Sequence, residues 1–306
     1  MEKVIVIVGP TAVGKTKLSV DLAKHLQTEI ISGDSMQVYK GMDIGTGKIT
    51  EKEKQHIPHH MLDIKNPDED FSVVAYQQEV QQLITHINQR HHTPILVGGS
   101  GLYIQAVLYD YVFSDQKRDD ELTKKLEKRI EDEGNHILYE ELKTMDPDHA
   151  KTIHPNNKRR LIRALEILYT TGQTMSEIRS KQENKPKYDH HIIGLAMDRE
   201  TLYNQINQRV DEMIEIGLVS EVKRLYEQGY EHTQAMKAIG YKEMIPYIKG
   251  ETDLETAVNL LKRNSRRYAK RQFTWFKNKM NVKWYQLTET NYDRILNKVI
   301  IDLQTY

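Results

Sequence analysis

The clearest chemical signal in the sequence is a glycine-rich loop near the amino terminus. Its residues match the pattern G-x-x-x-x-G-K-[ST] in full, and they are Gly9, Pro10, Thr11, Ala12, Val13, Gly14, Lys15 and Thr16. Glycines let the backbone wrap an anion, successive N–H groups point inward, and the following helix presents its positive end. Lys15 would neutralise phosphate oxygens, and the Thr16 hydroxyl would ligate Mg²⁺. The loop therefore predicts phosphate binding, as in nucleotide-binding and ATP-binding proteins.

The loop by itself leaves the phosphate chemistry open. Most proteins with such a loop split or transfer the γ-phosphate of a nucleotide, and a second strand usually ends in an Asp that holds Mg²⁺. One predicted strand, residues 29–32, leads to Asp34, whereas the strand at 94–97 is followed by Gly-Gly-Ser at 98–100. On the loop alone, a kinase is the favoured interpretation.

Further motifs change this interpretation, because together they resemble the successive signatures of bacterial tRNA dimethylallyltransferases. Besides the loop, they are DSMQVY (34–39), GMDIGT (41–46), PHHMLD (58–63), VGGSGLY (97–103), IHPN (153–156) with Arg160 and RALE (163–166), GYKEM (240–244), and AKRQ (269–272) with TW (274–275). The resemblance runs from about residue 3 to residue 285. Many motifs in the same order make it more specific than the loop.

The resemblance implies transfer of a dimethylallyl group from dimethylallyl diphosphate to N6 of the adenosine 3′-adjacent to the anticodon, with release of diphosphate. The loop would then hold the diphosphate leaving group rather than ATP. This chemistry is physically consistent, because the loop amides, Lys15 and Mg²⁺ can stabilise the charge that builds on the departing oxygens. The adenine amine is a poor nucleophile that must lose a proton, so a base is needed nearby.

The resemblance also implies a catalytic group made of Asp34, Ser100, Lys15 and Thr11. Asp34 is the predicted base, since ligands bind at the carboxyl ends of strands in open α/β sheets; the alternative is an Asp that holds Mg²⁺, as in kinases. Ser100, where the family more often has Thr, would donate to the bridging phosphate oxygen or to the base. Thr11 would contact the diphosphate or the prenyl group. Arg209 would clamp the diphosphate bidentately, unless it is an ordinary surface arginine.

A second set of residues is predicted to contact RNA. From Ala257 to Lys283 there are nine Lys or Arg and no Asp or Glu. On a helix, Arg263, Arg266, Arg267, Lys270 and Arg271 fall in one stripe, with Tyr268 and Trp275 among the apolar residues opposite. An acid-free stripe of cations is the footprint of a phosphate backbone.

The resemblance adds RNA contacts elsewhere. The Asp34–Gln37 turn would read the extruded base, with Gln37 hydrogen-bonded to a base edge. Thr123 falls where some relatives have Arg, so a contact there would be weaker. The predicted RNA contacts outside the stripe are Asp34, Ser35, Met36, Gln37, Thr123, Arg160, Arg163, Gly240, Tyr241 and Lys242.

Alternating elements must position these residues. Predicted strands at 4–8, 29–32 and 94–97 alternate with helices, a pattern typical of a parallel sheet with right-handed crossovers. After about residue 113 the chain is charged and helical, and an apolar strand returns at 192–197. From Glu200 onward we expect mostly helix. The prediction is an α/β, P-loop NTPase-like parallel sheet flanked by helices (1–112 and 190–306), with a helical insertion (113–189) that contacts tRNA.

Composition excludes several classes of protein. The formal net charge is zero and there is no Cys, which removes disulfides, thiol catalysis and Cys-based zinc sites. The longest aliphatic run, Val4–Val8, is too short to cross a bilayer, and no signal peptide is visible. We therefore expect a cytoplasmic monomer without membrane contact. The segment Gly45–Lys48 looks like a second phosphate loop and is interpreted as a coincidence.

Three other functions stay open from the sequence. A relative that prenylates free adenine nucleotides is disfavoured by the basic stripe and the insertion, which a small acceptor does not need. A small-molecule kinase would use the same loop for ATP. A P-loop RNA-binding protein without catalysis is disfavoured by Asp34.

Overall fold

The structure, a computed structural model, describes residues 1–113, 119–182 and 185–304. The chain divides into two compact units, a larger one of residues 1–108 and 186–306 and a smaller one of residues 109–185. The sequence-based division lies at residues 113 and 190. Within the described residues, no helix combines the length and the apolar character needed to cross a bilayer.

The larger unit is built on a six-stranded sheet in the order β3-β2-β4-β1-β5-β6. Every neighbouring pair is parallel, which confirms the predicted fold class. The strands are β1 (Lys3–Val8), β2 (Ile30–Ser32), β3 (His59–His60), β4 (Ile95–Gly98), β5 (Asp189–Met197) and β6 (Lys283–Leu287). The expectation that the chain after Glu200 is mostly helical misses β6. This edge strand buries only some of its residues, so its hydrophobic signal is weak.

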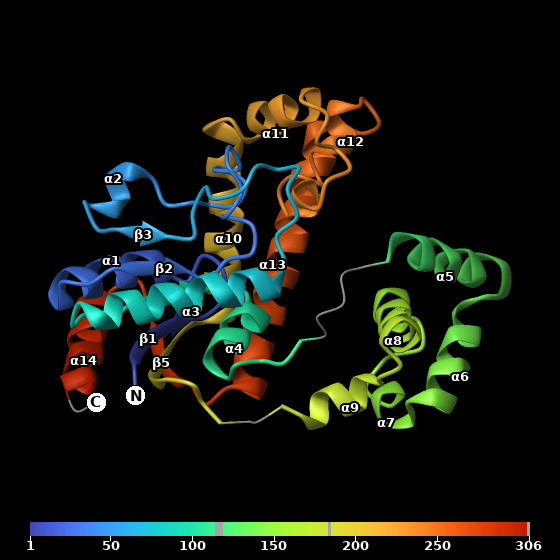
Figure 1. Cartoon of the computed structure of the whole chain (residues 1–306). Helices are drawn as coiled ribbons and strands as arrows, with labels where there is room; N and C mark the ends of the chain where they lie inside the picture. Colours follow the sequence, from blue (N-terminus) through green and yellow to red (C-terminus); the bar gives the residue numbers. More distant parts are fainter. Residues whose placement is uncertain (114–118, 183–184, 305–306) are drawn as a thin grey trace. The chain divides into compact units, whose positions relative to one another are not determined.

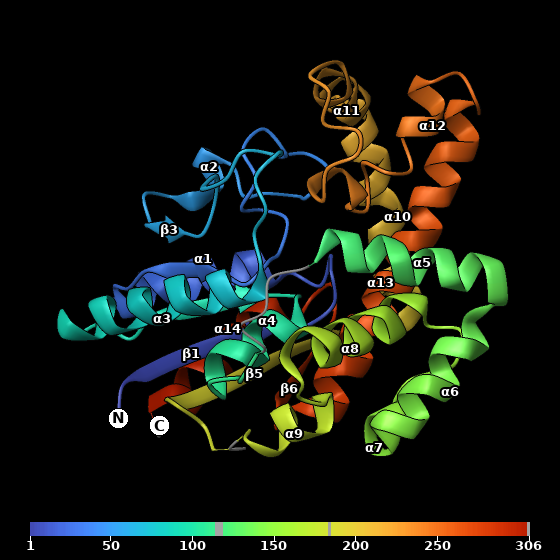
Figure 2. The same cartoon turned by 45° about the vertical axis from the view of Figure 1, so that its right-hand side comes forward.

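Helices surround this sheet (Figures 1 and 2). They are α1 (Lys15–Leu26), α2 (Glu51–Lys54), α3 (Val73–Gln89), α4 (Gly101–Leu108), α10 (Arg199–Glu215), α11 (Leu218–Glu227), a 3₁₀ turn (Ala235–Lys237), α12 (Ile245–Ile248), α13 (Leu254–Lys279) and α14 (Tyr292–Gln304). In both views α10 and α13 run side by side, with α11 and α12 at their far end. The start of β1 and the end of α14 lie close together in both views.

Two hydrophobic clusters of described residues link the sheet to its helices and to the helices α10–α13. The first lies against the sheet and includes Ile7 of β1, Leu18 of α1, Ile193 of β5 and Val299 of α14. β1 is buried along nearly its whole length, which explains its unbroken β-branched run. The second joins the segment after β2 to the helices α10–α13, which we call the helical arm. It includes Val38, Met42, Val222, Tyr241 and Leu261. The loops beside the sheet are thereby packed on helices from the distant C-terminal half.

The smaller unit is helical, with its own core. Its helices are α5 (Asp120–Glu133), α6 (Asn135–Met145), α7 (Pro147–Ala150), α8 (Lys158–Thr171) and α9 (Met175–Ser180). Leu126, Leu138, Leu161 and Leu165 meet in that core. The fully buried Glu166 accepts bonds from the Asp119 amide at 2.6 Å and from the Arg163 guanidinium at 3.0 Å. Arg163, a predicted RNA contact, is therefore engaged within this unit.

A buried carboxylate fixes the loop at residues 43–48. Glu221 of α11 accepts hydrogen bonds from the amides of Asp43, Ile44 and Gly45 at 3.0, 2.9 and 3.1 Å. It also accepts one from the Tyr241 hydroxyl at 2.6 Å. These four donors satisfy the carboxylate in a nearly dry setting, which is the condition for burying a charge at low cost.

The second apparent phosphate loop is a structural turn. Lys48 Nζ lies 2.6 Å from Asp43 Oδ1 and 2.5 Å from Asp63 Oδ1, and it donates to the Tyr39 carbonyl at 2.8 Å. A lysine paired with two carboxylates cannot also serve an anion. The interpretation of Gly45–Lys48 as a coincidence is confirmed.

We predict that Glu221→Ala lowers the free energy of unfolding by about 3 kcal/mol, because it leaves the buried Tyr241 hydroxyl and three partly buried amides without their acceptor. Urea denaturation at pH 7 measures this change. The matched control is Glu215→Ala, an exposed position on α10, which should shift stability by less than about 0.5 kcal/mol. Equal effects of the two substitutions would show that Glu221 does not anchor the loop.

Candidate active site

The carboxyl edge of the sheet brings the three predicted chemical segments together. The phosphate loop follows β1, Asp34 follows β2 and Ser100 follows β4, and β4 lies between the other two strands. The Gly33 amide donates to the Val97 carbonyl at 2.7 Å, and the Ser100 amide donates to the Gly33 carbonyl at 3.3 Å. A Cβ added at Gly98 would lie 2.3 Å from the Gly33 oxygen, so only glycine allows this approach.

The phosphate loop leads directly into α1. Its N-cap residue, Gly14, has no side chain, so no side-chain cap occupies the first backbone amides of the helix. Gly14 is the N-cap residue with φ +95°, a left-handed conformation that glycine adopts without strain. The first turn of α1 carries no acidic residue, so its positive end is not neutralised locally. Lys15 Nζ donates to the Pro10 carbonyl at 2.7 Å, which folds the side chain back over the loop. This arrangement suits an anion with several oxygens.

Two cations share this site. Burial and the nearby charge of Arg209 lower the pKa of Lys15 to about 7, while Asp34 acts in the opposite direction. Burial likewise lowers the pKa of Arg209, whose Nη2 donates to the Gly47 carbonyl at 3.4 Å. Both cations are therefore held at an electrostatic cost, which a bound polyanion would offset. Arg209 belongs to the phosphate loop's surroundings and is not an ordinary surface arginine.

Asp34 is a partly exposed carboxylate in a poorly solvated setting. Burial raises its pKa, against the lowering effect of bonds from the Met36 and Gln37 amides to Oδ1 (2.8 and 3.3 Å) and of Lys15 and Arg209. The rings of Tyr76 and Tyr103 pack 4.7 Å apart, and burial raises the pKa of both phenols, with the charge of Asp34 adding to the rise. These aromatic residues were not predicted from the sequence. A carboxylate with a raised pKa is suited to accept a proton near neutral pH.

Ser100 is held between the Asp34 turn and α13. Its Oγ accepts a hydrogen bond from the Ser35 amide at 3.2 Å. Burial and the charge of Asp34 raise the pKa of the Tyr268 phenol to about 12, while the side chains of Ser100 and Gln272 act in the opposite direction. Helical spacing predicts Tyr268 on the apolar side of α13, so its position beside the site is not apparent from the sequence. The AKRQ and TW motifs pointed to α13 but not to this role.

Several residues predicted to contact RNA have other partners. Gln37 accepts a bond from the Ser32 hydroxyl at 3.0 Å and donates to the carbonyls of Thr46 and Gly47, so in this conformation it supports the loop. Gly240 and Tyr241 are buried, and the Tyr241 hydroxyl is bonded to Glu221. Thr123 is buried on α5. In this conformation the side chains of Tyr241 and Thr123 present little surface to a ligand, and their direct contact with RNA stays a prediction.

Other predicted residues remain accessible. Arg160 on α8 and Lys242 are exposed, and Ser35 and Met36 are partly exposed. On α13, Arg263, Arg267, Lys270 and Arg271 are exposed. Arg266 differs, because it is half-buried and donates to Asn207 of α10 at 2.5 Å. We call the four exposed cations the basic face of α13.

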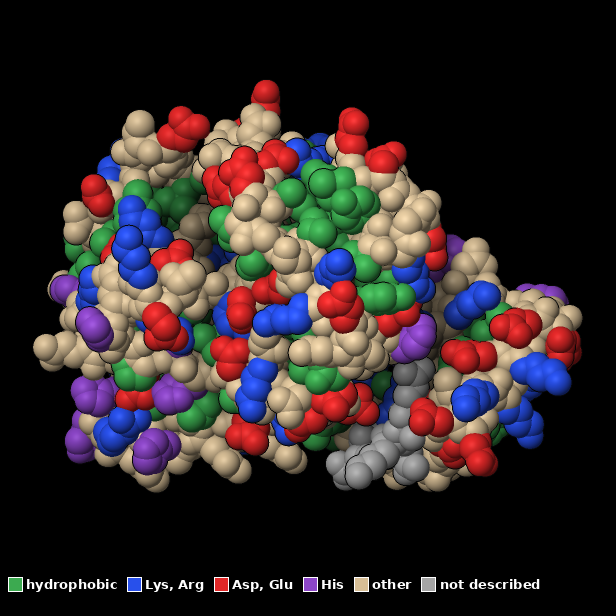
Figure 3. All heavy atoms as spheres, turned by 90° about the horizontal axis from the view of Figure 1, so that it is seen from above, with side chains coloured by type: hydrophobic (Ala, Val, Ile, Leu, Met, Phe, Trp, Pro, Cys, Tyr) green, Lys and Arg blue, Asp and Glu red, His purple; other side chains and the backbone are tan. Residues whose placement is uncertain are grey.

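The basic face is a local feature of a neutral molecule. Over the surface seen in Figure 3, acidic and basic side chains are interspersed, and the formal net charge is zero. A ligand drawn to α13 would therefore be selected by local charge density rather than by the overall field.

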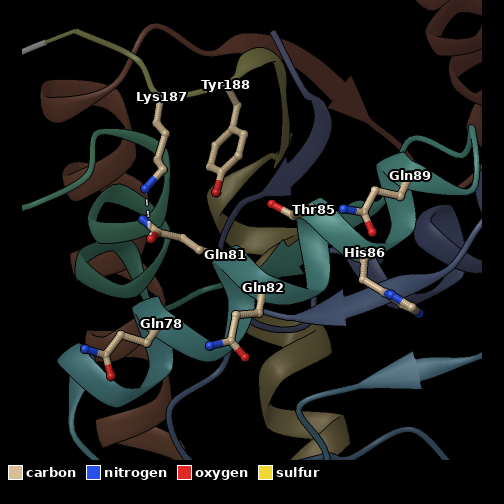
Figure 4. A pocket seen from close by; sticks show the side chains of 8 residues that line it. All are labelled: Gln78, Gln81, Gln82, Thr85, His86, Gln89, Lys187 and Tyr188. Atoms are coloured by element: carbon tan, nitrogen blue, oxygen red, sulfur yellow. Dashed lines mark hydrogen bonds between the residues drawn. The ribbon is translucent and has the colours of Figure 1, made fainter.

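A cavity lies at the edge of the sheet opposite the candidate site. Polar side chains of α3, with Lys187 and Tyr188, line a cavity of about 450 Å³ (Figure 4). Lys187 Nζ points to Gln81 and donates to its Oε1 at 3.0 Å. Lys187 and Tyr188 precede β5, so this cavity faces the amino edge of the sheet, opposite the phosphate loop. It is not part of the candidate site.

We predict that diphosphate binding weakens as pH rises through about 7, because Lys15 is a cation below that pKa and loses its charge above it. Calorimetric titration of inorganic diphosphate between pH 6 and 9 measures this. Lys15→Arg, which stays charged throughout, is the control for ionisation of the diphosphate itself. The affinity of the wild type relative to the variant should fall by up to roughly tenfold per pH unit above 7. A constant ratio would mean that Lys15 does not titrate there.

Comparison with known proteins assigns the chain to a family. The IPP transferase family profile matches residues 37–279. A tRNA dimethylallyltransferase of Oceanobacillus iheyensis is 55% identical over 302 residues, which cover 99% of this chain and 96% of that protein.

Solved structures agree with this comparison. A full-length tRNA isopentenylpyrophosphate transferase from Bacillus halodurans shares 48% identity, with a TM-score of 0.76 over 100% of this chain and 96% of that one. A eukaryotic dimethylallyltransferase acting on tRNA shares 32% identity, with a TM-score of 0.85 over 100% and 80% of the two chains. The chain belongs to the IPP transferase family.

Proposed function

We propose that this protein transfers a dimethylallyl group from dimethylallyl diphosphate to N6 of the adenosine 3′-adjacent to the anticodon of a tRNA, releasing diphosphate. The observation that carries the proposal is the pairing of Lys15 and Arg209 beside the amino end of α1, next to the carboxylate of Asp34. The two cations and the amino end of α1 suit a departing diphosphate, and the Asp34 carboxylate suits the role of proton acceptor. The relatives named above are described as acting on tRNA or as tRNA prenyltransferases.

The phosphate loop supports departure of the diphosphate. As the bond from the allylic carbon to the bridging oxygen breaks, its electron pair passes to the diphosphate. Lys15, Arg209 and the α1 amides are placed to stabilise that charge. The attraction of the two cations for the ligand strengthens as negative charge grows on the departing diphosphate. A bound anion also offsets the repulsion between the cations. Ser100 and Thr11 would direct the bridging oxygen and the prenyl chain.

Asp34 supports attack by the acceptor. The adenine nitrogen forms a bond to the allylic carbon, and the proton it loses passes to the Asp34 carboxylate. Burial raises the pKa of Asp34, so the carboxylate is a stronger base than an exposed aspartate. Its Oδ1 is held by two backbone amides, which fixes the direction of the carboxylate.

The donor set fits Mg²⁺ that arrives with the diphosphate. Among the described residues no group of three or more His, Asp or Glu side chains could hold a metal ion. Mg²⁺ commonly binds to substrate phosphates, one or two protein oxygens and water, so Thr16 at the start of α1 would supply a hydroxyl. In the alternative to its role as a base, Asp34 would hold the ion through a water molecule. When bound, Mg²⁺ would neutralise charge on the leaving group.

The basic face of α13 supports RNA as the acceptor. Its four exposed cations lie on the helix that also carries Tyr268 and Gln272 to the active site. A stem-loop docked there would place a flipped base near Asp34. We further propose that the smaller unit adds contacts through Arg160, and that the protein acts as a cytoplasmic monomer.

We predict that Asp34→Asn keeps the shape of the site and lowers turnover roughly 10²–10⁴-fold, while tRNA affinity barely changes. Labelled dimethylallyl diphosphate and total tRNA are incubated with Mg²⁺ and without nucleoside triphosphate, and acid-precipitable label is counted. Wild type should transfer label without ATP, and ATP should compete weakly at most. An absolute requirement for ATP would restore the kinase interpretation. Equal losses of affinity and turnover would show that Asp34 orders the site instead.

We predict that replacing Arg263, Arg267 and Lys270 with Gln weakens tRNA binding. Each lost charge should flatten the plot of log affinity against log salt by up to roughly one unit, with diphosphate binding unchanged. Arg266 is left intact because its bond to Asn207 joins α13 to α10. Lys298→Gln, at an exposed position on α14, is the control. An unchanged affinity and salt slope in the triple variant would exclude the basic face as the RNA contact.

A further inference from the structure

One side chain joins two parts of the active site that are far apart in sequence. The Thr11 amide of the phosphate loop donates to Gln272 Oε1 at 2.8 Å. The same Gln272 side chain donates through Nε2 to the Gly99 carbonyl at 3.1 Å. Its amide is buried, so neither bond is replaced easily by water. The loop after β1 and the loop after β4 are therefore tied to each other through α13.

Side chains of α13 pack closely against the backbone on either side of Ser100. A Cβ added at Gly99 would lie 2.0 Å from Gln272 Nε2, and one added at Gly101 would lie 2.2 Å from the Trp275 ring. Residues 272 and 275 are three apart and share a face of α13. They therefore contact the backbone on both sides of Ser100.

The bridge also uses a group that phosphate loops normally offer to the ligand. Backbone amides of such loops point inward to cradle phosphate oxygens. Here the Thr11 amide is satisfied by Gln272, so it anchors the loop. The remaining amides and Lys15 are then presented from a loop whose position is set by α13.

We infer that Gln272 is a positioning residue that fixes the diphosphate loop relative to Ser100 and Asp34. The inference rests on the proposed function, because that function assigns Thr11 and Ser100, at the two ends of the bridge, to the prenyl donor and Asp34, beside Ser100, to the acceptor. Holding them in line matters because a misplacement of about 1 Å can cost roughly 10²-fold in rate. Gln272 touches neither reacting group, so its loss should lower kcat while KM for tRNA stays nearly constant.

The test uses Gln272→Met, which keeps length and packing but removes both hydrogen bonds. We expect kcat for prenyl transfer to fall roughly 10²-fold, with KM for tRNA within about threefold and the acidic limb of the pH profile unchanged, since Asp34 is still the base. Gln89→Met, at an exposed position on α3 near the amino edge of the sheet, is the matched control and should behave as wild type.

Gly99→Ala attacks the same bridge from its other end and guards against a variant that fails to fold. Because both substitutions break one connection, the double variant should lose little more kcat than either single variant. The inference is overturned if folded Gln272→Met keeps wild-type kcat, if only its melting temperature falls, or if the two losses in kcat multiply. Failure of the wild type to transfer label in the same assay would instead overturn the proposed function.

Discussion

Burial of two cations, Lys15 and Arg209, in one site is the constraint on which the rest of the structure depends. Both cations are largely removed from water, and the proximity of Arg209 contributes to the fall of the Lys15 pKa to about 7. A protein retains such a pair when a ligand of opposite charge stabilises it. Asp34 balances part of the charge, and burial raises the Asp34 pKa. A departing diphosphate would supply the rest of the balance when its charge is greatest.

The fold brings the charged residues of the site together. Parallel strands place the loops after β1, β2 and β4 at one edge, and close backbone contact between Gly33 and Gly98 draws Asp34 and Ser100 together. The helical arm then fixes these loops from outside. Glu221 holds residues 43–45, and Gln272 holds Thr11 and Gly99. Residues far along the chain thus hold catalytic loops that a sheet by itself would leave free.

The sequence predicts what local patterns determine and misses what long-range contacts determine. The phosphate loop, the strand at 4–8 and the α13 helix follow from spacing within a few residues, and the structure contains all three. The two-residue β3 and the edge strand β6 carry too little periodic signal to be seen. Glu221 and Gln272 appear in sequence as an ordinary helical acid and amide. Their roles depend on partners more than 170 residues away.

Motif resemblance identifies important positions more reliably than it assigns their roles. Tyr241 lies in a family motif, but its hydroxyl serves Glu221 inside the protein. Gln37 lies in another, and its side chain supports the loop at 46–47. Arg266 lies in the basic stripe and bonds to Asn207. In each case burial or a local partner, invisible in a linear sequence, decides between a structural and a ligand-binding role.

In the proposed reaction, the phosphate loop stabilises a diphosphate that leaves by cleavage of a carbon–oxygen bond. Dimethylallyl diphosphate labelled with ¹⁸O at the bridging oxygen tests it directly, with mass spectrometry of the released diphosphate and of the tRNA nucleosides. We expect all of the label to appear in diphosphate, in a one-to-one ratio with prenylated adenosine. Label retained in dimethylallyl alcohol, or a phosphorylated rather than prenylated product, would contradict it.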